Sequence, residues 1–291
     1  LFHRGPDDSG CFFENLSDVQ VGLGHRRLSI LDLSNHGHQP MTFNHLTIVF
    51  NGEVYNFKEI RSELKKYNYT FSSNSDTEVI LKAYHKWGIE AIHRFNGMFA
   101  IAILDKERGT LTLIRDRAGV KPLYWHLKDG LFMFSSELKS FHEHPDFEKE
   151  LNKNSLRLFF KHGYVPQPHT IFNNTHKLSA GYILELPLNS AKIKIEKYWD
   201  VIDCYNSPKL NISRQEAQNE TERLLKSACE YRMVSDVPVG VFLSGGYDSS
   251  VVAALLQSER AKKIKTFSIG FHNKKFNEAH HAKNVAKYLG T

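Results

Sequence analysis

Cysteine is scarce in this sequence of 291 residues: Cys11, Cys204 and Cys229 are the only three, and none belongs to a Cys-x-x-Cys pair. An odd number at such spacings argues against a disulfide framework and a structural zinc site. No apolar run reaches the length of a membrane span, and the first residues are not those of a signal peptide. These absences predict a globular protein of the reducing cytoplasm with no membrane partner.

Positive charge is present without being concentrated. The net charge is +6, but the 38 Lys and Arg residues are interleaved with 32 acidic residues. Proteins that bind nucleic acids usually gather their basic residues on one face or along one helix. We therefore expect no nucleic-acid partner and expect the positive charge to serve small anionic ligands instead.

The length allows two domains of ordinary size. The polar segment 200–211, which contains Pro208, predicts an interdomain linker, so the expected domains are residues 1–200 and 212–291. The first residue is Leu1 rather than Met, and Thr291 directly follows Gly290, a typical helix C-cap. We therefore expect a fragment of a longer protein.

The first half alternates short apolar runs with turn residues. This pattern predicts strands at 46–50, 98–105, 111–115, 123–126 and 131–135. Apolar residues at helical spacing predict a helix over 77–87, with Ser75 and Glu78 forming its capping box. We expect an α+β domain in which helices cover stacked sheets.

The second half contains a strand, a glycine-rich turn and a helix in succession. Residues 237–243 are an apolar, β-branched run, and residues 249–258 carry apolar positions at helical spacing. The glycines of the turn let backbone N–H groups approach an anion, and the helix directs the positive end of its dipole to the same place. The turn itself is Ser244, Gly245, Gly246, Tyr247 and Asp248.

Asp248 is unexpected in a loop that binds phosphate, because its carboxylate would repel the ligand unless a divalent cation lay between them. This predicts a magnesium site at Asp248. A plain strand-to-helix turn is the alternative. The loop lacks the lysine of a Walker motif and the third glycine of a dinucleotide fingerprint. It resembles the pyrophosphate loop of N-type ATP pyrophosphatases, which activate a carboxylate or carbonyl as an adenylate. Helical patterns at 214–232 and 278–289 flank it, and a strand over 264–271 predicts a parallel α/β sheet.

Polar motifs also gather in the N-terminal half, and each alone has a structural explanation such as a hairpin turn or a surface ion pair. Together, ahead of the phosphate loop, they resemble the class II glutamine amidotransferase domain of glutamine-hydrolysing asparagine synthetases, the asparagine synthetase B family. The resemblance covers nearly the whole chain. The motifs are His3-Arg-Gly-Pro-Asp-Asp-Ser-Gly, His25-Arg-Arg-Leu-Ser-Ile-Leu-Asp, Asn51-Gly-Glu-Val-Tyr-Asn, Ser75-Asp and Arg115-Asp-Arg-Ala-Gly-Val-Lys-Pro-Leu-Tyr.

The resemblance implies an Ntn-type, four-layer αββα sandwich followed by a truncated α/β ATP-pyrophosphatase domain. It also implies that Arg27 holds the α-carboxylate of glutamine, that Asn51 and Gly52 form a catalytic oxyanion hole, and that Glu53 and Asp76 receive the α-ammonium. The complete implied glutamine site is Arg27, Leu28, Ser29, Ile30, Asn51, Gly52, Glu53 and Asp76.

The nucleophile that the resemblance implies is an N-terminal cysteine, whose own α-amino group acts as the base. This sequence begins with Leu1, and Cys11 lies inside the chain without a free amine. We therefore expect the sequence as printed to be inactive in glutamine hydrolysis.

In the second half, the resemblance implies ATP and Mg²⁺ as cofactors and aspartate as the acceptor that becomes asparagine. Tyr247 stands where family members commonly have leucine, so a sugar carboxylate or another metabolite is an alternative acceptor. A non-catalytic protein with the same fold is a further alternative. A homodimer is compatible with the resemblance. The implied nucleotide site is Leu243, Ser244, Gly245, Gly246, Asp248, Ser249 and Ile269, with Asp248 as the magnesium ligand.

Overall fold

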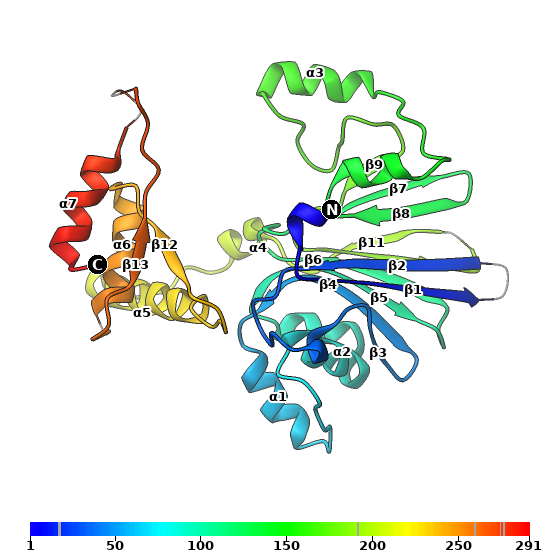
Figure 1. Ribbon diagram of the computed structural model, residues 1–291, viewed down its shortest axis with the longest axis horizontal. Helices are drawn as coiled ribbons and strands as arrows, with labels where there is room; N and C mark the ends of the chain where they lie inside the picture. The colour runs from blue at the N-terminus through cyan, green and yellow to red at the C-terminus, as the bar shows by residue number, and fades with distance from the viewer. Residues whose placement is uncertain (17–18, 191, 259, 274, 276) are drawn as a thin grey trace. The chain divides into compact units, whose positions relative to one another are not determined.

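Two strands of nine residues, β4 and β5, lie side by side within an antiparallel sheet of six strands. The computed structural model describes residues 1–16, 19–190, 192–258, 260–273, 275 and 277–291 (Figure 1). Strand β5 is buried along most of its length because its apolar residues have neighbours on both faces of the sheet. In spatial order the strands are β11 (Lys194–Lys197), β10 (Tyr182–Pro187), β6 (Thr110–Arg115), β5 (Gly97–Asp105), β4 (Leu46–Val54) and β3 (Met41–Phe43).

Helices α1 (Phe57–Lys65) and α2 (Asp76–Trp87) cover one face of this sheet (Figure 1). The apolar face of α2 is fully buried, as the helical spacing of Val79, Ile80 and Ala83 predicts. The helix therefore has a fixed orientation, and its first turn carries Asp76 in a buried position.

Two smaller sheets cover the opposite face. One is the hairpin of β1 (Asp8–Leu16) and β2 (Val19–Arg27), and the other consists of β7 (Tyr124–Lys128), β8 (Leu131–Ser135) and β9 (Thr175–Lys177). Helix α3 (Lys153–His162) lies beyond β7, β8 and β9 (Figure 1). The helix layer and two sheet layers agree with the expected sandwich. Their shared apolar core includes Val21, Leu23, Val49, Ala102, Leu113 and Leu184.

The expected capping box at the start of α2 is only half correct. Ser75 is the N-cap, and its hydroxyl accepts a hydrogen bond from Thr77 N. Glu78 does not close the box, because its carboxylate accepts hydrogen bonds from Ser72 and Ser73 and from the ammonium of Lys82. A cation and four polar groups of the preceding loop compete better for the carboxylate than the single N–H of the cap.

The predicted strands of the first half are confirmed as β4 to β8. The hairpin of β1 and β2 was missed, because glycines and charged residues alternate with its apolar residues and weaken the strand pattern. Helix α3 was missed as well, although Asn152 caps its start and Gly163 ends it.

The chain divides into two compact units, Leu1–Ser207 and Pro208–Thr291. The segment expected to be a plain linker contains a short helix, α4 (Val201–Asn206), whose N-cap Asp200 accepts a hydrogen bond from Ile202 N. The second unit contains a parallel pair of strands, β12 (Gly240–Phe242) and β13 (Lys265–Phe267). Its helices are α5 (Arg214–Tyr231), α6 (Tyr247–Ser258) and α7 (Ala279–Leu289).

The small core of the second unit is built from the apolar faces of α6 and α7 against β12, and includes Leu243, Ala253, Leu256, Ile264 and Ala282. The predicted order of strand, loop, helix, strand and helix is confirmed here, and β12 and β13 pair in parallel as expected. Among the helices of the described residues, none is both long and apolar enough to cross a bilayer.

Candidate functional site

A cavity of about 460 Å³ opens in the first unit, where the end of β2, the end of β4 and the first turn of α2 come together. Its walls come from segments far apart in the sequence, which is typical of a ligand site. One residue of the expected glutamine site, Ser29, does not line this cavity. Its N–H donates a hydrogen bond to Asp7 Oδ2 at 2.8 Å. The expected glutamine-site residues that do line the cavity are Arg27, Leu28, Ile30, Asn51, Gly52, Glu53 and Asp76.

Arg27 is buried at the end of β2, and its guanidinium organises the loop that follows. Nη1 donates to Ser34 O at 2.9 Å, and Nη2 donates to Leu31 O at 3.1 Å and also to Asp32 O. A guanidinium has five N–H groups in a fixed fork, so these three bonds leave others for a ligand. Arg27 therefore combines a structural role with a place in the cavity wall.

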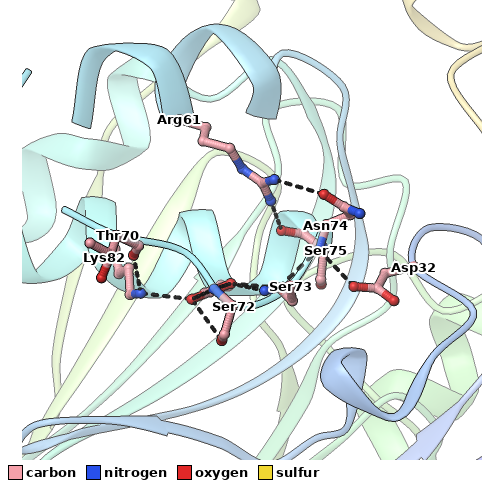
Figure 2. A network of polar contacts seen from close by, with 9 residues as sticks. Asp32, Arg61, Thr70, Ser72, Ser73, Asn74, Ser75 and Lys82 are labelled. Carbon is pink, nitrogen blue, oxygen red and sulfur yellow. Dashed lines mark hydrogen bonds and ion pairs between the residues drawn. The ribbon is translucent and has the colours of Figure 1, made fainter. Parts of the chain in front are cut away.

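Asp32 links this loop to the segment before α2, as Figure 2 shows. Its Oδ1 accepts from Ser34 N at 3.1 Å, and its Oδ2 accepts from Asn74 N at 2.6 Å. Arg61 of α1 supports the same segment by donating to Asn74 Oδ1 at 3.2 Å and to Ser75 O at 3.1 Å. The loop that Arg27 organises and the start of α2 are thus tied together by side chains.

Asp76 is buried, and its Oδ2 accepts a hydrogen bond from Val54 N at 2.9 Å. Burial raises the pKa of Asp76 to about 7, and the nearby charge of Glu53 acts in the same direction. The hydrogen bond from Val54 opposes this shift without cancelling it. A cationic ligand group would favour the ionised form of Asp76. This wall of the cavity therefore suits a positively charged group.

Glu53 and Lys121 both line the cavity, and their opposite charges attract each other. Burial raises the pKa of Glu53 and lowers that of Lys121, and each charge partly offsets the shift of the other. Lys121 is held in place by the loop after β6: the carboxylate of Asp116 accepts from Lys121 N at 3.0 Å, and Arg115 Nε donates to Lys121 O at 2.8 Å. Two residues of the motif at 115–124 therefore hold the backbone of a lysine that lines the cavity.

Asn51 and Gly52 lie at the end of β4. Asn51 Nδ2 donates to Ser136 Oγ at 3.2 Å, which fixes the direction of its amide. Gly52 has φ of 155°, and a Cβ built on it would lie 2.1 Å from Met98 O. Only glycine fits there, because its backbone packs directly against β5.

Several residues that line the cavity were not among the expected site residues. Glu137 accepts from His3 Nε2 at 2.9 Å and from Arg4 Nη1 at 3.1 Å, and all three line the cavity. Gln39 and Lys121 line it as well. The motifs that contain His3, Arg4 and Lys121 were recognised in the sequence, but only the fold brings these side chains to the cavity.

The expected phosphate loop connects β12 to α6 in the second unit. Gly245 has φ of 87°, and a Cβ there would lie 2.8 Å from the Cβ of His281 on α7. The hydroxyls of Ser244 and Ser249 are 2.9 Å apart, and they accept from Gly246 N at 3.3 Å and from Ser244 N at 3.2 Å respectively. Two loop amides are thus bonded within the loop. The first turn of α6 still provides N–H groups that the helix itself cannot pair.

The remaining residues of the expected nucleotide site differ in exposure. Asp248 is exposed at the start of α6, and Ile269 is 68% exposed. Leu243 is only 2% exposed, and its N–H donates to Phe267 O while its C=O accepts from Ser268 Oγ. Within the described residues no group of three or more His, Cys, Asp or Glu side chains could hold a metal ion. A cation at Asp248 would therefore take most of its ligands from phosphate and water, as Mg²⁺ commonly does.

Comparison with known proteins agrees with this division of the chain. Residues 1–199 match the glutamine amidotransferase domain family, and residues 220–291 match the asparagine synthase family. A relative in Methanocaldococcus jannaschii, provisionally named a glutamine-hydrolysing asparagine synthetase, is 41% identical over 99% of this chain and 58% of its own length. Asparagine synthetase [glutamine-hydrolyzing] 1 of Bacillus subtilis is 36% identical over 100% of this chain and 44% of its own.

Amidase chry2 of Gibberella zeae is 34% identical over 88% of this chain and 37% of its own length. The chain spans about half the length of the curated relatives it matches. The sequence-based resemblance to the glutamine-hydrolysing asparagine synthetases is confirmed by these matches. This chain belongs to the glutamine amidotransferase domain family through residues 1–199, with a match to the asparagine synthase family after it.

Proposed function

We propose that the protein containing this chain is a glutamine-dependent amide ligase of the asparagine synthetase type. Glutamine is hydrolysed to glutamate and ammonia at the cavity of the first unit. The ammonia then attacks an adenylated carboxylate bound by the second unit, with aspartate as the acceptor. The observation that carries the proposal is the convergence of Arg27, Asn51, Gly52, Glu53 and Asp76 on one cavity.

The charges around the cavity suit glutamine at both ends of its amino-acid group. The guanidinium of Arg27 matches a carboxylate, while Glu53 and Asp76 match an ammonium. The raised pKa values of both acids mean that their charged forms are disfavoured until a cation arrives. Binding an α-ammonium therefore relieves an electrostatic cost of the empty cavity, which favours amino acids over simple amides.

The amide of the substrate would then extend toward Asn51 and Gly52. Donors directed at the developing oxyanion stabilise the tetrahedral intermediate, and each is worth about 10²- to 10³-fold in kcat. Bonding of Asn51 to Ser136 holds the side-chain amide in a defined direction before substrate binds. The nucleophile that enzymes of this class use, an N-terminal cysteine, is not a residue of the printed sequence.

In the second unit, the loop from Ser244 to Ser249 and the first turn of α6 would bind the β- and γ-phosphates of ATP. The first-turn N–H groups and the helix dipole favour an anion at this position. Asp248 fits as a magnesium ligand because it is the exposed carboxylate of that turn. Bound magnesium would neutralise charge that develops on the departing pyrophosphate.

The two halves can be separated by mutation in the protein expressed with its natural N-terminus. Asn51→Ala should lower glutamine hydrolysis by about 10²- to 10³-fold and spare ammonia-dependent synthesis. Asp248→Asn should abolish aspartate-dependent release of pyrophosphate while sparing glutamine hydrolysis. Glutamate and pyrophosphate formation measured side by side give both readouts. Pyrophosphate release that survives in Asp248→Asn would reject the nucleotide site.

A second acceptor class is favoured by one observation: Tyr247, at the start of α6 and within the expected phosphate loop, is 93% exposed. A bulky phenol there could contact a sugar carboxylate or another metabolite. We expect a panel of carboxylates to separate the candidates through pyrophosphate release. Stimulation by aspartate supports asparagine synthesis, and stimulation by another carboxylate alone identifies a related amidotransferase.

A further inference from the structure

The side chain of Gln39 lies between two walls of the cavity and is bonded to both. It is 5% exposed. Its Oε1 accepts from Phe50 N at 2.6 Å, and its Nε2 donates to Phe50 O at 3.2 Å and to Thr77 Oγ1 at 3.3 Å. Phe50 directly precedes Asn51, and Thr77 directly follows Asp76. One amide therefore joins the strand that carries the expected oxyanion hole to the helix that carries the expected ammonium partner.

The local sequence explains why a side chain takes this place. Strand β3 begins at Met41, which pairs with Ile48, and the same register continued toward the N-terminus would put residue 39 opposite Phe50. Pro40 has no N–H and interrupts the ladder. The side-chain amide of Gln39 continues the pairing in place of the backbone. Because Phe50 N–H can only donate and its C=O can only accept, the orientation of the amide is determined.

The peptide of Phe50 is held from a second side as well. His25 Nε2 lies 3.0 Å from Phe50 O. Burial lowers the pKa of His25 to about 4, so its ring is neutral near pH 7, and the nitrogen facing the carbonyl carries the proton and donates. Phe50 O thus accepts two hydrogen bonds. The backbone that leads into Asn51 is fixed before any ligand binds.

We propose that Gln39 is a positioning residue that sets the spacing between the oxyanion hole at Asn51 and Gly52 and the ammonium subsite at Asp76. Both N–H groups of its amide are engaged by Phe50 and Thr77, so it acts through these neighbours rather than through the substrate. The consequence is selectivity for an amide whose α-ammonium lies at the distance found in glutamine. This inference rests on the proposed glutaminase function of the same cavity.

The test compares two substrates in the full protein with its natural N-terminus. One is L-glutamine and the other is glutaramate, which is glutamine without its α-amino group; release of ammonia is measured for both. A site that hydrogen-bonds a polar group can reject an analogue lacking it by on the order of 10⁴-fold. Misplacement by about 1 Å costs about 100-fold in rate. Loss of the correct spacing should therefore reduce kcat/KM for glutamine and bring it closer to kcat/KM for glutaramate.

Four variants separate positioning from general stability. Gln39→Leu removes all three bonds, and Thr77→Val removes only the bond to α2. Both should lower the ratio of kcat/KM for glutamine to that for glutaramate by about tenfold or more. Thr77→Ser keeps the hydroxyl, so its ratio should be close to that of the unmutated protein. Gln20→Leu, at an exposed position of β2, is the matched control and should leave the ratio unchanged.

Circular dichroism and the thermal unfolding transition of each variant report whether the first unit, which carries Gln39 and Thr77, is folded. If Gln39→Leu fails to fold, the comparison of Thr77→Val with Thr77→Ser decides the question. An equal loss for both substrates, with an unchanged ratio, assigns Gln39 a structural role only and overturns the inference. If the unmutated protein hydrolyses no glutamine, the proposed function itself fails, which distinguishes the two results.

Discussion

Burial of single side chains decides which charges the cavity presents. Burial raises the pKa of both Asp76 and Glu53, and it lowers the pKa of Lys121. Each of these groups gives up hydration in order to line the cavity, and a ligand with an ammonium group replaces part of what the two carboxyl groups lose. The shifted pKa values of these side chains therefore predict how the glutamine reaction depends on pH.

Asp76 should give the glutamine reaction a pH dependence. Its pKa is about 7 in the empty cavity, and only the ionised carboxylate binds an ammonium. Because deprotonation occurs as the pH rises, kcat/KM for glutamine should increase with pH and level off above about 7, falling about tenfold per unit on the acid side. Initial rates of glutamate formation across this range provide the measurement.

Asp76→Asn is the matched variant, because the amide keeps the shape and cannot ionise. It should raise KM for glutamine and lose this step in the pH profile. A profile that is flat between about pH 5 and 8 in the unmutated protein would show that Asp76 does not govern binding.

At the scale of elements, the first turn of α2 is held by a buried ion pair. Burial would raise the pKa of Glu78, but hydrogen bonds from Lys82, Ser73 and Ser72 outweigh it and lower the pKa to about 2. Because the pKa of Glu78 lies below its ordinary value of 4.5, the ionised carboxylate stabilises the fold at pH values above 4.5. This contribution is lost as the pH falls from 4.5 toward 2. The loop in Figure 2 thus depends on the ionised form of Glu78.

Removing one partner of this pair should be costly. Glu78→Ala leaves the ammonium of Lys82 buried without a counter-charge and should lower the free energy of unfolding by about 3–5 kcal/mol. The double variant Glu78→Leu with Lys82→Met replaces both charges by apolar groups and should recover most of the loss. Urea denaturation of each protein measures the difference.

An exposed ion pair provides the control. Lys194 and Glu196 are 2.7 Å apart on β11, where both side chains are largely exposed. Glu196→Ala should change the unfolding free energy little, because exposed pairs contribute little. An equally small effect of Glu78→Ala would show that the network of Figure 2 does not stabilise the start of α2.

At the scale of the whole molecule, the two units differ in how much apolar surface they bury. The first unit has a sandwich core that strands of three sheets share. The second has a small core, and Phe242, Phe267, Ile269 and Tyr288 are more than half exposed.

The two units should therefore behave differently when they are produced separately. Residues 1–207 should unfold in one cooperative transition, since their core is internal to the unit. Residues 208–291 should show a broad transition and bind a hydrophobic dye, because a core this small offsets little conformational entropy. Circular dichroism and dye fluorescence of the two polypeptides test this. A sharp transition without dye binding for residues 208–291 would contradict the prediction.

Local patterns predicted much of the fold. Apolar alternation located β4 to β8, helical spacing located α2, α5 and α7, and the glycine-rich turn located the loop between β12 and α6. The hairpin of β1 and β2 escaped prediction because glycines and charged residues alternate with its apolar residues. Helix α3 escaped prediction although its apolar residues recur at helical spacing between Asn152 and Gly163. The role of Glu78 was misjudged, since its partners are the loop before the helix and Lys82 one turn further along the helix, rather than the cap.

The sequence by itself determined the family, the residue types of the candidate site and the order of the elements, because these depend on motifs and short-range periodicity. Only the tertiary structure decided that Arg27, Asn51, Glu53 and Asp76 share one cavity and that Gln39 joins two of its walls. It also decided the charge state of that cavity, because a pKa depends on burial and on neighbours from distant segments. Such contacts are set by how the sheets and helices pack, which spacing along the chain does not encode.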